Sequence, residues 1–480
     1  MKTKSLLYYI KFIAATSMLV ACASQRPEYP KLREVPATYK QNSDTSSTIA
    51  RIPIRSFFRD SLLLGLLDEA LRENLEIKKA YQRLMISQAG LRASKGAFLP
   101  TVNGVASAAQ RRFGDYTMDG IGNYDTNFSD NIGDDKRIPE RLPDYYIGVQ
   151  STWEIDVWGK LRNARRAAAA RVLASEQGRR WLTTRVITEV ASLYYDLLSL
   201  DNELAIVNKN LLLQERAVEV IKVQKMAGRA NELGVRQLTA QVLNTQTLRS
   251  KLKQDIAEVE YRMNFMLGRF PQTIERGNPI MEQRLPESLH IGIPAQMLMR
   301  RPDVQAAAYS LEAAKADVNA AYAAFFPTIA LSASVGLQAF DPSKLFNAGS
   351  LAYSLLGGLT APILNRNQIS SQFRISSANG YEAFYEYQQV SIDAYRDVMT
   401  NLSRIDNYDS MSRYKTEELQ DLNLAVQASN DLFATGFATY LEVIAAQRGA
   451  LDAELTLAQI RRDQFKAVID LYRSLGGGWE

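Results

Sequence analysis

The sequence predicts an α+β protein in which very long helices alternate with antiparallel strands, and three observations lead to this fold class. All 15 prolines lie outside residues 144–270 and 363–480, which indicates two long helical regions, because a proline inside a helix costs about 3 kcal/mol. Apolar and polar residues alternate with period two just before each region, which is typical of strands. The same order of patterns also occurs twice along the chain.

This internal repeat is visible when the chain is shifted against itself. An offset of 227 residues aligns the end of the first apolar helical pattern with the end of a later one, and an offset of 208 aligns two glycine turns. The matched pairs are Phe98 with Phe325, Pro100 with Pro327, Thr101 with Thr328, Gly228 with Gly436, and Leu233 with Leu441. Repeats of this kind indicate a quasi-symmetric assembly of like parts and argue against a catalytic domain with one cleft.

The amino terminus has the pattern of an export signal. Lysines precede the apolar run 12–20, which is too short for a membrane-spanning helix and matches the core of a secretory signal peptide over residues 1–21. The run ends in Leu19-Val20-Ala21-Cys22, which resembles the lipobox of bacterial lipoproteins. Cys22 is the only cysteine and has no partner for an internal disulfide, so we expect it to carry a covalent lipid.

Composition limits the classes of partner. The formal net charge is only +5 and the basic residues are interspersed with acidic ones, so nucleic acid is not expected as a partner. No cofactor is expected apart from the lipid on Cys22. After the signal, no stretch of 18 consecutive apolar residues occurs, which excludes helical membrane spans but leaves strand-built ones open.

Four long helices are predicted, at residues 160–226, 232–267, 366–434 and 440–475. Within the first, apolar residues recur at alternating steps of four and three, a 3.5-residue period that favours left-handed coiled-coil packing. These residues are Val186, Val190, Leu193, Leu197, Leu200, Leu204, Val207 and Leu211. Gly228 and Gly436 stand where each pair of helices is expected to turn.

Four strands are predicted, at about residues 101–113, 143–157, 327–340 and 350–363, by alternation and a nearby proline. In the strands at 143–157 and 327–340, one face is apolar and the other is small or polar. The polar face is expected to contain Tyr146, Gly148, Gln150, Thr152, Ser332, Ser334 and Gln338. A closed barrel needs about eight strands, so if these strands span a membrane, several chains must share one barrel.

These patterns divide the chain into six segments. They are the signal peptide at 1–21, a lipidated extended segment at 22–60, the first repeat at 61–270, a connector at 271–294, the second repeat at 295–475 and a tail at 476–480. Each repeat contains a first helix, two strands and two long helices.

The order of these segments resembles the outer-membrane factors of tripartite efflux pumps, the TolC-like or NodT-type lipoprotein family. The motif Trp153-Glu154-Ile155-Asp156-Val157-Trp158-Gly159-Lys160-Leu161-Arg162, matched by Ala361-Pro362-Ile363-Leu364-Asn365-Arg366-Asn367-Gln368-Ile369 in the second copy, supports this resemblance together with the lipobox. The resemblance implies a homotrimer with an antiparallel twelve-stranded outer-membrane β-barrel, four strands from each chain. A periplasmic α-helical coiled-coil barrel and a mixed belt around its waist, which includes the connector, are also implied.

The resemblance further implies a function, an exit duct for small molecules such as drugs or toxic compounds, without enzymatic activity. Its partners would be outer-membrane lipids, a periplasmic adaptor protein and an inner-membrane pump of the RND type. The adaptor would contact the hairpin tips, and the second tip would also close the pore. The implied tip contacts are Gly228, Leu233, Gly436 and Leu441, and the implied constriction is Glu442 with Phe433, Leu441 and Gly436.

Other readings of the chain stay open. Three Glu442 side chains around a threefold axis would favour cations and raise each other's pKa, but Glu442 is equally compatible with a solvated surface. His290 is the only histidine, and a metal site built on it is not expected. The acidic segment 114–142 is expected to be an exposed extracellular loop, with ion binding left open. A duct for type I protein secretion and a non-channel periplasmic coiled-coil scaffold are the alternative functions.

Overall fold

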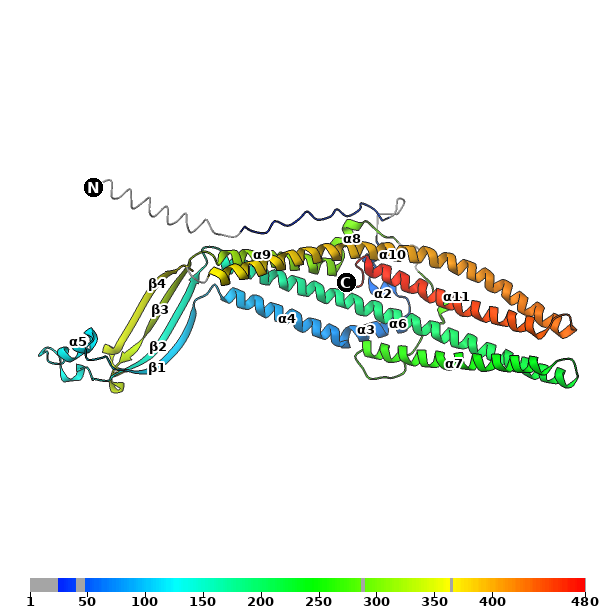
Figure 1. The fold of residues 1–480 in the computed structure, drawn as a ribbon, viewed down its shortest axis with the longest axis horizontal. Coiled ribbons are helices and arrows are strands. Elements are labelled where there is room, and N and C mark those ends of the chain that lie inside the picture. Colours follow the sequence, from blue (N-terminus) through cyan, green and yellow to red (C-terminus); the bar gives the residue numbers. More distant parts are fainter. Residues whose placement is uncertain (1–24, 40–47, 286–289, 363–365, 480) are drawn as a thin grey trace. The chain divides into compact units, whose positions relative to one another are not determined.

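The computed structural model describes residues 25–39, 48–285, 290–362 and 366–479 (Figure 1). The predicted signal peptide, the predicted lipid site Cys22 and residues 363–365 of the second-copy motif lie outside the described residues. No helix in the described part of the chain combines the length and the apolar character needed to cross a membrane.

The chain forms two compact units. The strand unit contains Met1–Tyr29, Ser87–Val172 and Leu311–Ala383, and the hairpin unit contains Pro30–Ile86, Leu173–Ser310 and Phe384–Glu480. Both units therefore contain residues from the first and the second predicted repeat. Helices α4 (Leu75–Gly96), α6 (Lys160–Met226), α9 (Pro302–Ala323) and α10 (Arg366–Thr435) contribute residues to both.

Four antiparallel strands form one sheet in the strand unit (Figure 1). They are β1 (Thr101–Arg111), β2 (Leu142–Ile155), β3 (Thr328–Ala339) and β4 (Leu351–Thr360), and they pair in chain order. The period-two pattern thus predicts each strand close to its observed position, although the predicted ranges extend up to 113, 157, 340 and 363. Strand β2 ends earlier than predicted because Gly159, with φ of +80°, turns the chain into α6.

The loop between β1 and β2 is more ordered than the sequence predicts for residues 114–142. It contains the helix α5 (Met118–Thr126), whose first turn is capped by the Thr117 hydroxyl, which accepts a hydrogen bond from the Gly120 N–H. The Asn127 side chain exchanges two hydrogen bonds with the backbone of Ile138, both 2.8 Å long. These side-chain bonds, rather than an apolar core, hold the loop together.

Two long helical hairpins dominate the hairpin unit. Helix α6 pairs with α7 (Glu232–Met266), and α10 pairs with α11 (Tyr440–Ser474). In Figure 1 the turns of both hairpins lie at the same end of this unit. Apolar contacts between the hairpins at that end confirm this, because Tyr440 and Ile444 pack against buried residues of α6 and α7.

The buried face of α6 follows the predicted heptad. Val190, Leu197 and Val207 are fully buried, and the other predicted positions of the heptad are buried or partly buried. Short elements then close the core beside α6. They are α2 (Ile54–Phe57), α3 (Ser61–Glu73) and α8 (Pro294–Arg300), together with 3-10 turns at Ile49–Arg51 and Ile280–Glu282. Burial of one face along α6 explains why a helix of 67 residues is stable.

Candidate functional site

The two faces of the sheet differ in chemistry, and the strand register shows this residue by residue. On one face Val149 lies opposite Val335, which in turn lies opposite Tyr353. On the other face Gln150 lies opposite Ser334, and Thr152 lies opposite Ser332. The register thus confirms that the seven residues predicted to share the polar face do so.

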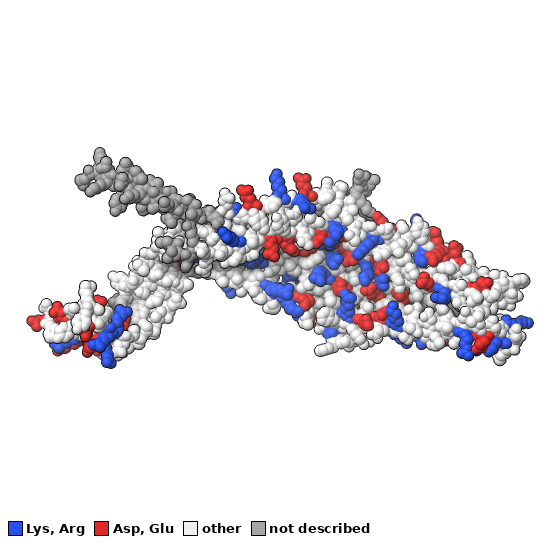
Figure 2. Space-filling model, in the orientation of Figure 1, with Lys and Arg blue, Asp and Glu red and all other residues white. Residues whose placement is uncertain are grey.

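The apolar face has no cover among the residues that the structure describes. Tyr353 and Leu355 of β4 are 83% and 77% exposed, and Val335 at the centre of the sheet is 47% exposed. Figure 2 shows the strands as a largely uncharged surface, with charged side chains gathered beyond one end of the sheet. Large apolar side chains exposed in a continuous face mark a membrane or protein contact surface.

Both edge strands also lack a second neighbouring strand in the described part of the chain. Strand β1 pairs only with β2, and β4 pairs only with β3, so one side of each has unpaired backbone N–H and C=O groups within the described residues. Exposed sheet edges are templates for pairing with another chain. The sheet is therefore suited to continue into a further sheet of the same kind.

The motif Trp153-Glu154-Ile155-Asp156-Val157-Trp158-Gly159-Lys160 forms the joint between β2 and α6. Asp156 accepts hydrogen bonds from the backbone N–H groups of Leu161 and Arg162, at 2.9 and 3.0 Å, and so caps the start of α6. The indole N–H groups of Trp153 and Trp158 donate to the carbonyls of Phe98 and Pro327. The motif thus fixes the path of the chain where strands meet helices.

The tip of the α10–α11 hairpin contains the residues predicted to close the pore. Gly436 has φ of +84°, a left-handed conformation that favours glycine, and the Phe437 N–H donates to the Leu432 carbonyl across the turn. Phe437 and Leu441 are exposed, Phe433 is half-buried, and Glu442 is exposed on the first turn of α11. The structure thus brings the four predicted constriction residues to one hairpin tip.

Glu442 has a second role that the sequence analysis did not identify. Its carboxylate accepts a hydrogen bond from the Thr439 backbone N–H at 2.7 Å, and the Thr439 side chain accepts one from the Glu442 backbone N–H, which together form a capping box. The Thr439 hydroxyl also donates to the Glu442 carboxylate. In the single chain the hydrogen bond from the Thr439 hydroxyl is the main cause that lowers the pKa of Glu442. The Thr-x-x-Glu spacing in the sequence is the signal that could have revealed this cap.

The tip of the α6–α7 hairpin differs in chemistry. Gly228 has φ of +71°, and the Asn231 side chain accepts from the Gly234 N–H at 3.0 Å to cap α7. Glu232 pairs with both Lys225 and Arg236 around the turn. Leu233 is exposed beside these charges. The first tip is therefore charged, whereas the second exposes Phe437 and Leu441.

A groove of about 360 Å³ lies between the two hairpins near their tips. Its walls come from α6, α7, α10 and α11 and include Arg216, Leu238, Phe433 and Tyr440. At its floor the Tyr440 ring packs so close to Gly234 that a Cβ at this position would lie 3.0 Å from the ring. The second hairpin is therefore seated directly on the first.

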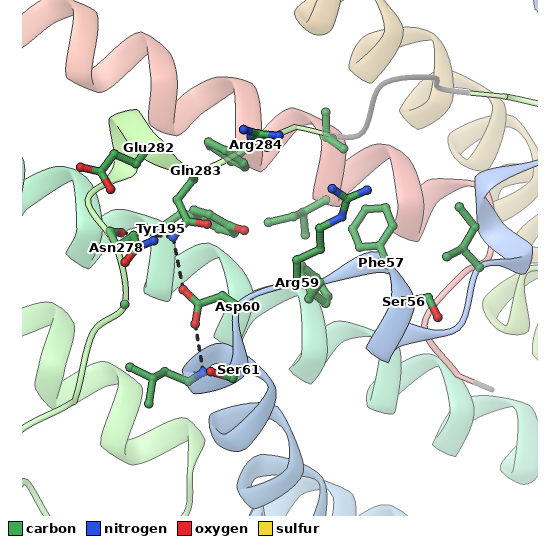
Figure 3. A pocket seen from close by; sticks show the side chains of 17 residues that line it. Ser56, Phe57, Arg59, Asp60, Ser61, Tyr195, Asn278, Glu282, Gln283 and Arg284 are labelled. Atoms are coloured by element: carbon green, nitrogen blue, oxygen red, sulfur yellow. Dashed lines mark hydrogen bonds between the residues drawn. The ribbon is translucent and has the colours of Figure 1, made fainter.

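A larger cavity of about 810 Å³ lies deeper in the hairpin unit, beside α2 and α3 (Figure 3). Figure 3 shows Asp60 between Gln283 and the first turn of α3. One Asp60 oxygen accepts from the Leu62 N–H at 2.9 Å, and the other accepts from the Tyr194 hydroxyl at 2.7 Å. This carboxylate therefore holds the start of α3 against α6.

Metal binding has no support in the described part of the chain. No group of three or more His, Cys, Asp or Glu side chains is placed there to hold an ion. The carbonyl of His290 accepts from the Ile49 N–H at 2.8 Å, so its backbone joins the connector to the segment 48–52.

Comparison with known proteins agrees with this geometry. A family model described as outer membrane efflux protein matches residues 66–269 and 293–477. The chain is 27% identical to the solvent efflux pump outer membrane protein SrpC of Pseudomonas putida, over 100% of this chain and 99% of SrpC. It is 25% identical to the probable outer membrane lipoprotein SilC of Salmonella typhimurium, over 97% of this chain and 98% of SilC.

A solved structure shows the same fold. The outer-membrane channel OprN superimposes with a TM-score of 0.83, over 95% of this chain and 99% of OprN, at 23% sequence identity. At this identity the likeness establishes the fold alone. It covers both the four-stranded sheet and the long hairpins, so the α+β architecture is that of a known outer-membrane channel.

Proposed function

The chain belongs to the outer membrane efflux protein family, and from this membership we propose that three copies of it form the exit duct of a tripartite pump. As a member of this family it is an outer-membrane efflux channel of a Gram-negative bacterium. The observation that supports the trimer is the sheet itself. Four strands with two open edges, one apolar face and one polar face fit a shared barrel in which the polar faces line water.

A reconstitution experiment tests this proposal. Protein extracted from outer membranes should have the mass of a homotrimer in detergent, and it should conduct ions in planar bilayers without a nucleotide. A monomer, or a trimer that never conducts in its full-length form, would contradict the shared barrel. Exposure of the apolar face to water would then need another explanation, such as a soluble partner.

The internal repeat is part of the same proposal. The order α4, β1, β2, α6, α7 recurs as α9, β3, β4, α10, α11, with similar lengths for the corresponding helices and strands. This order supports two repeats at 61–270 and 295–475, joined by a connector at 271–294 that contributes to a belt around the helices. Three chains would then supply six similar hairpins to the helical barrel.

We propose that a periplasmic adaptor protein contacts the hairpin tips and that an inner-membrane pump, of the RND type, supplies the energy. The exposed residues at the tips, Gly228, Leu233, Gly436 and Leu441, are the proposed adaptor contacts. The relative SrpC is named as a solvent efflux pump protein, which favours small toxic molecules as cargo over secreted proteins. We propose no catalytic activity for the chain itself.

We propose that the second hairpin tip is the periplasmic gate. Phe433, Leu441 and Glu442 lie within two turns of the hinge glycine Gly436, and their side chains are at least partly exposed in the single chain. Around a threefold axis they would form an apolar constriction beside a ring of three carboxylates. Binding of an adaptor to the open state would then shift the population of the hairpins toward separation.

Lipidation of Cys22 completes the proposal. The lipobox-like sequence supports it, and the relative SilC is named as an outer membrane lipoprotein. Mass spectrometry of the mature amino terminus should find an acylated Cys22. An unmodified Cys22, or cleavage at another residue, would show that the chain is held in the membrane by its strands alone.

A further inference from the structure

One side chain stands out on the polar face of the sheet. Across the four strands, all of which are described, this face consists of small or polar residues and a few aliphatic ones, with Tyr146 as its one aromatic side chain. Tyr146 lies on β2, opposite Ser107 of β1 and Gln338 of β3. It is therefore near the middle of the sheet rather than at an edge.

The Tyr146 ring lies flat against the sheet over two glycines. Gly148 and Gly336 face each other on neighbouring strands. A Cβ built on Gly336 would lie 2.8 Å from Tyr146 Cζ, and a Cβ built on Gly148 would lie 2.7 Å from the Tyr146 hydroxyl oxygen. The ring thus occupies the space that two side chains would need, and one of its π-faces is turned away from the sheet.

A carboxylate lies next to this ring on the same face. Asp144 is two residues before Tyr146 on β2, and its Oδ1 accepts a hydrogen bond from Gln338 Nε2 at 2.8 Å. The basic residue on the same face at the end of β1, Arg111, has its guanidinium over the Phe113 ring at 5.7 Å. The negative charge of Asp144 is therefore not neutralised by an ion pair with Arg111.

We propose that Tyr146 and Asp144 form a contact point for organic cations that carry an aromatic ring. This inference rests on the proposed function, because it requires the polar face to line the pore. Tyr146 is half-buried. The accessible part of its ring attracts cations and stacks with aromatic groups, and a carboxylate at short range adds charge attraction. Three copies around the axis would place three such contact points at one level of the pore.

Two quaternary ammonium ions, one with an aromatic ring and one without, test the inference. Benzyltrimethylammonium contains an aromatic ring, whereas tetraethylammonium has a similar size and the same charge without one. Added on the strand side of a single channel in a planar bilayer, benzyltrimethylammonium should block the wild-type current at a lower concentration. Tyr146→Leu, which removes the ring but keeps an apolar side chain at this position, should raise its half-blocking concentration about fivefold and that of tetraethylammonium by less.

Three further variants separate the contributions of the Tyr146 ring, its hydroxyl and the Asp144 carboxylate to the block. Tyr146→Phe should keep the block, because the ring face and not the hydroxyl makes the contact. Asp144→Asn should weaken the block by both cations. Tyr145→Leu, the matched control on the opposite face, should change neither. Trimer mass and heat stability are measured for each variant, so that a folding defect is recognised.

The outcomes distinguish this inference from the proposed function. A wild-type protein without any current contradicts the proposed channel. The contact point is contradicted if benzyltrimethylammonium blocks a conducting Tyr146→Leu channel as strongly as the wild type. It is also contradicted if this cation blocks Tyr146→Phe only as weakly as Tyr146→Leu. Neither outcome contradicts the proposed channel.

Discussion

Glu442, Asp156 and Asn231 all use their side chains to hold the first turn of a long helix. Each accepts hydrogen bonds from backbone N–H groups that have no partner within the helix. For Glu442 this local task is compatible with a gate, since a carboxylate has enough lone pairs to accept bonds and still face the pore. The cap also holds the Glu442 carboxylate, and with it the negative charge, against the first turn of α11.

The ring of Glu442 side chains is tested by a charge-neutral variant and a control for the cap. Glu442→Gln should lower cation preference in planar bilayers and keep the trimer, because Gln also fits a capping box. Thr439→Val removes the hydroxyl partner but keeps the charge, so its selectivity should stay near wild type. Equal selectivity in wild type, Glu442→Gln and Glu442→Lys would leave Phe433 and Leu441 as the constriction.

The same cap predicts a pH dependence at the hairpin tip. The pKa of Glu442 is lowered in the folded chain, so the cap stabilises the first turn of α11 above the ordinary carboxyl pKa and is lost as the pH falls through the lowered value. Hydrogen exchange of the amides at 440–444, corrected for intrinsic rates, should show protection falling as the pH drops below the ordinary carboxyl range. A fall at a higher pH would instead indicate repulsion within the proposed ring of three carboxylates. In Glu442→Gln the protection should not change across this range, because the amide does not titrate.

At the scale of elements, the alternation in the strands predicts which face meets lipid in the proposed barrel. Val335 and Ser334 are neighbours in β3, yet they lie on opposite faces of the sheet. Val335→Arg should impair membrane insertion at a cost of about 2–4 kcal/mol near mid-membrane, whereas Ser334→Arg should be tolerated and alter ion selectivity. The measurement is the yield of heat-resistant trimer in outer membranes. Equal yields for both variants would mean that neither face meets lipid.

The long elements were predictable because their signals repeat many times. The absence of proline from 144–270 and the 3.5-residue period of α6 each depend on many residues, so one exception does not hide the pattern. The helix α5 was missed because it depends on single side chains, Thr117 and Asn127, and has no buried face. The caps at Thr439 and Asn231 depend on two or three residues each and were missed for the same reason.

Residue pairing within the candidate site was predictable only in part. Alternation predicted which residues share the polar face, because each strand has a fixed period of two. It did not predict that Gly148 lies opposite Gly336, or that Tyr146 covers both, because strand register depends on turns and packing far apart in sequence. The covalent lipid and the ring at the threefold axis involve residues or copies beyond the described chain, so they stay predictions.

At the scale of the whole molecule, the free edges of the sheet predict cross-linking between chains. Within one chain β1 and β4 are separated by two strands, so their backbones lie about 14 Å apart, too far for a disulfide. Chains with Ser107→Cys in β1, combined in turn with cysteine at positions 352, 354 and 356 of β4, should give covalent dimers and trimers after oxidation. The single Ser107→Cys variant is the control. Cross-links that stop at dimers, or none at any position, would contradict a ring of three.

The open edges of the sheet also have a genetic consequence. A chain whose β1 edge is blocked by a proline would still offer β4 to an intact neighbour, so it would join rings that it prevents from closing. In a cell that makes equal amounts of intact and blocked chains, only about one ring in eight would contain three intact chains. Such an allele would be dominant over the wild type, and the severity of its phenotype would rise with the dosage of the defective gene.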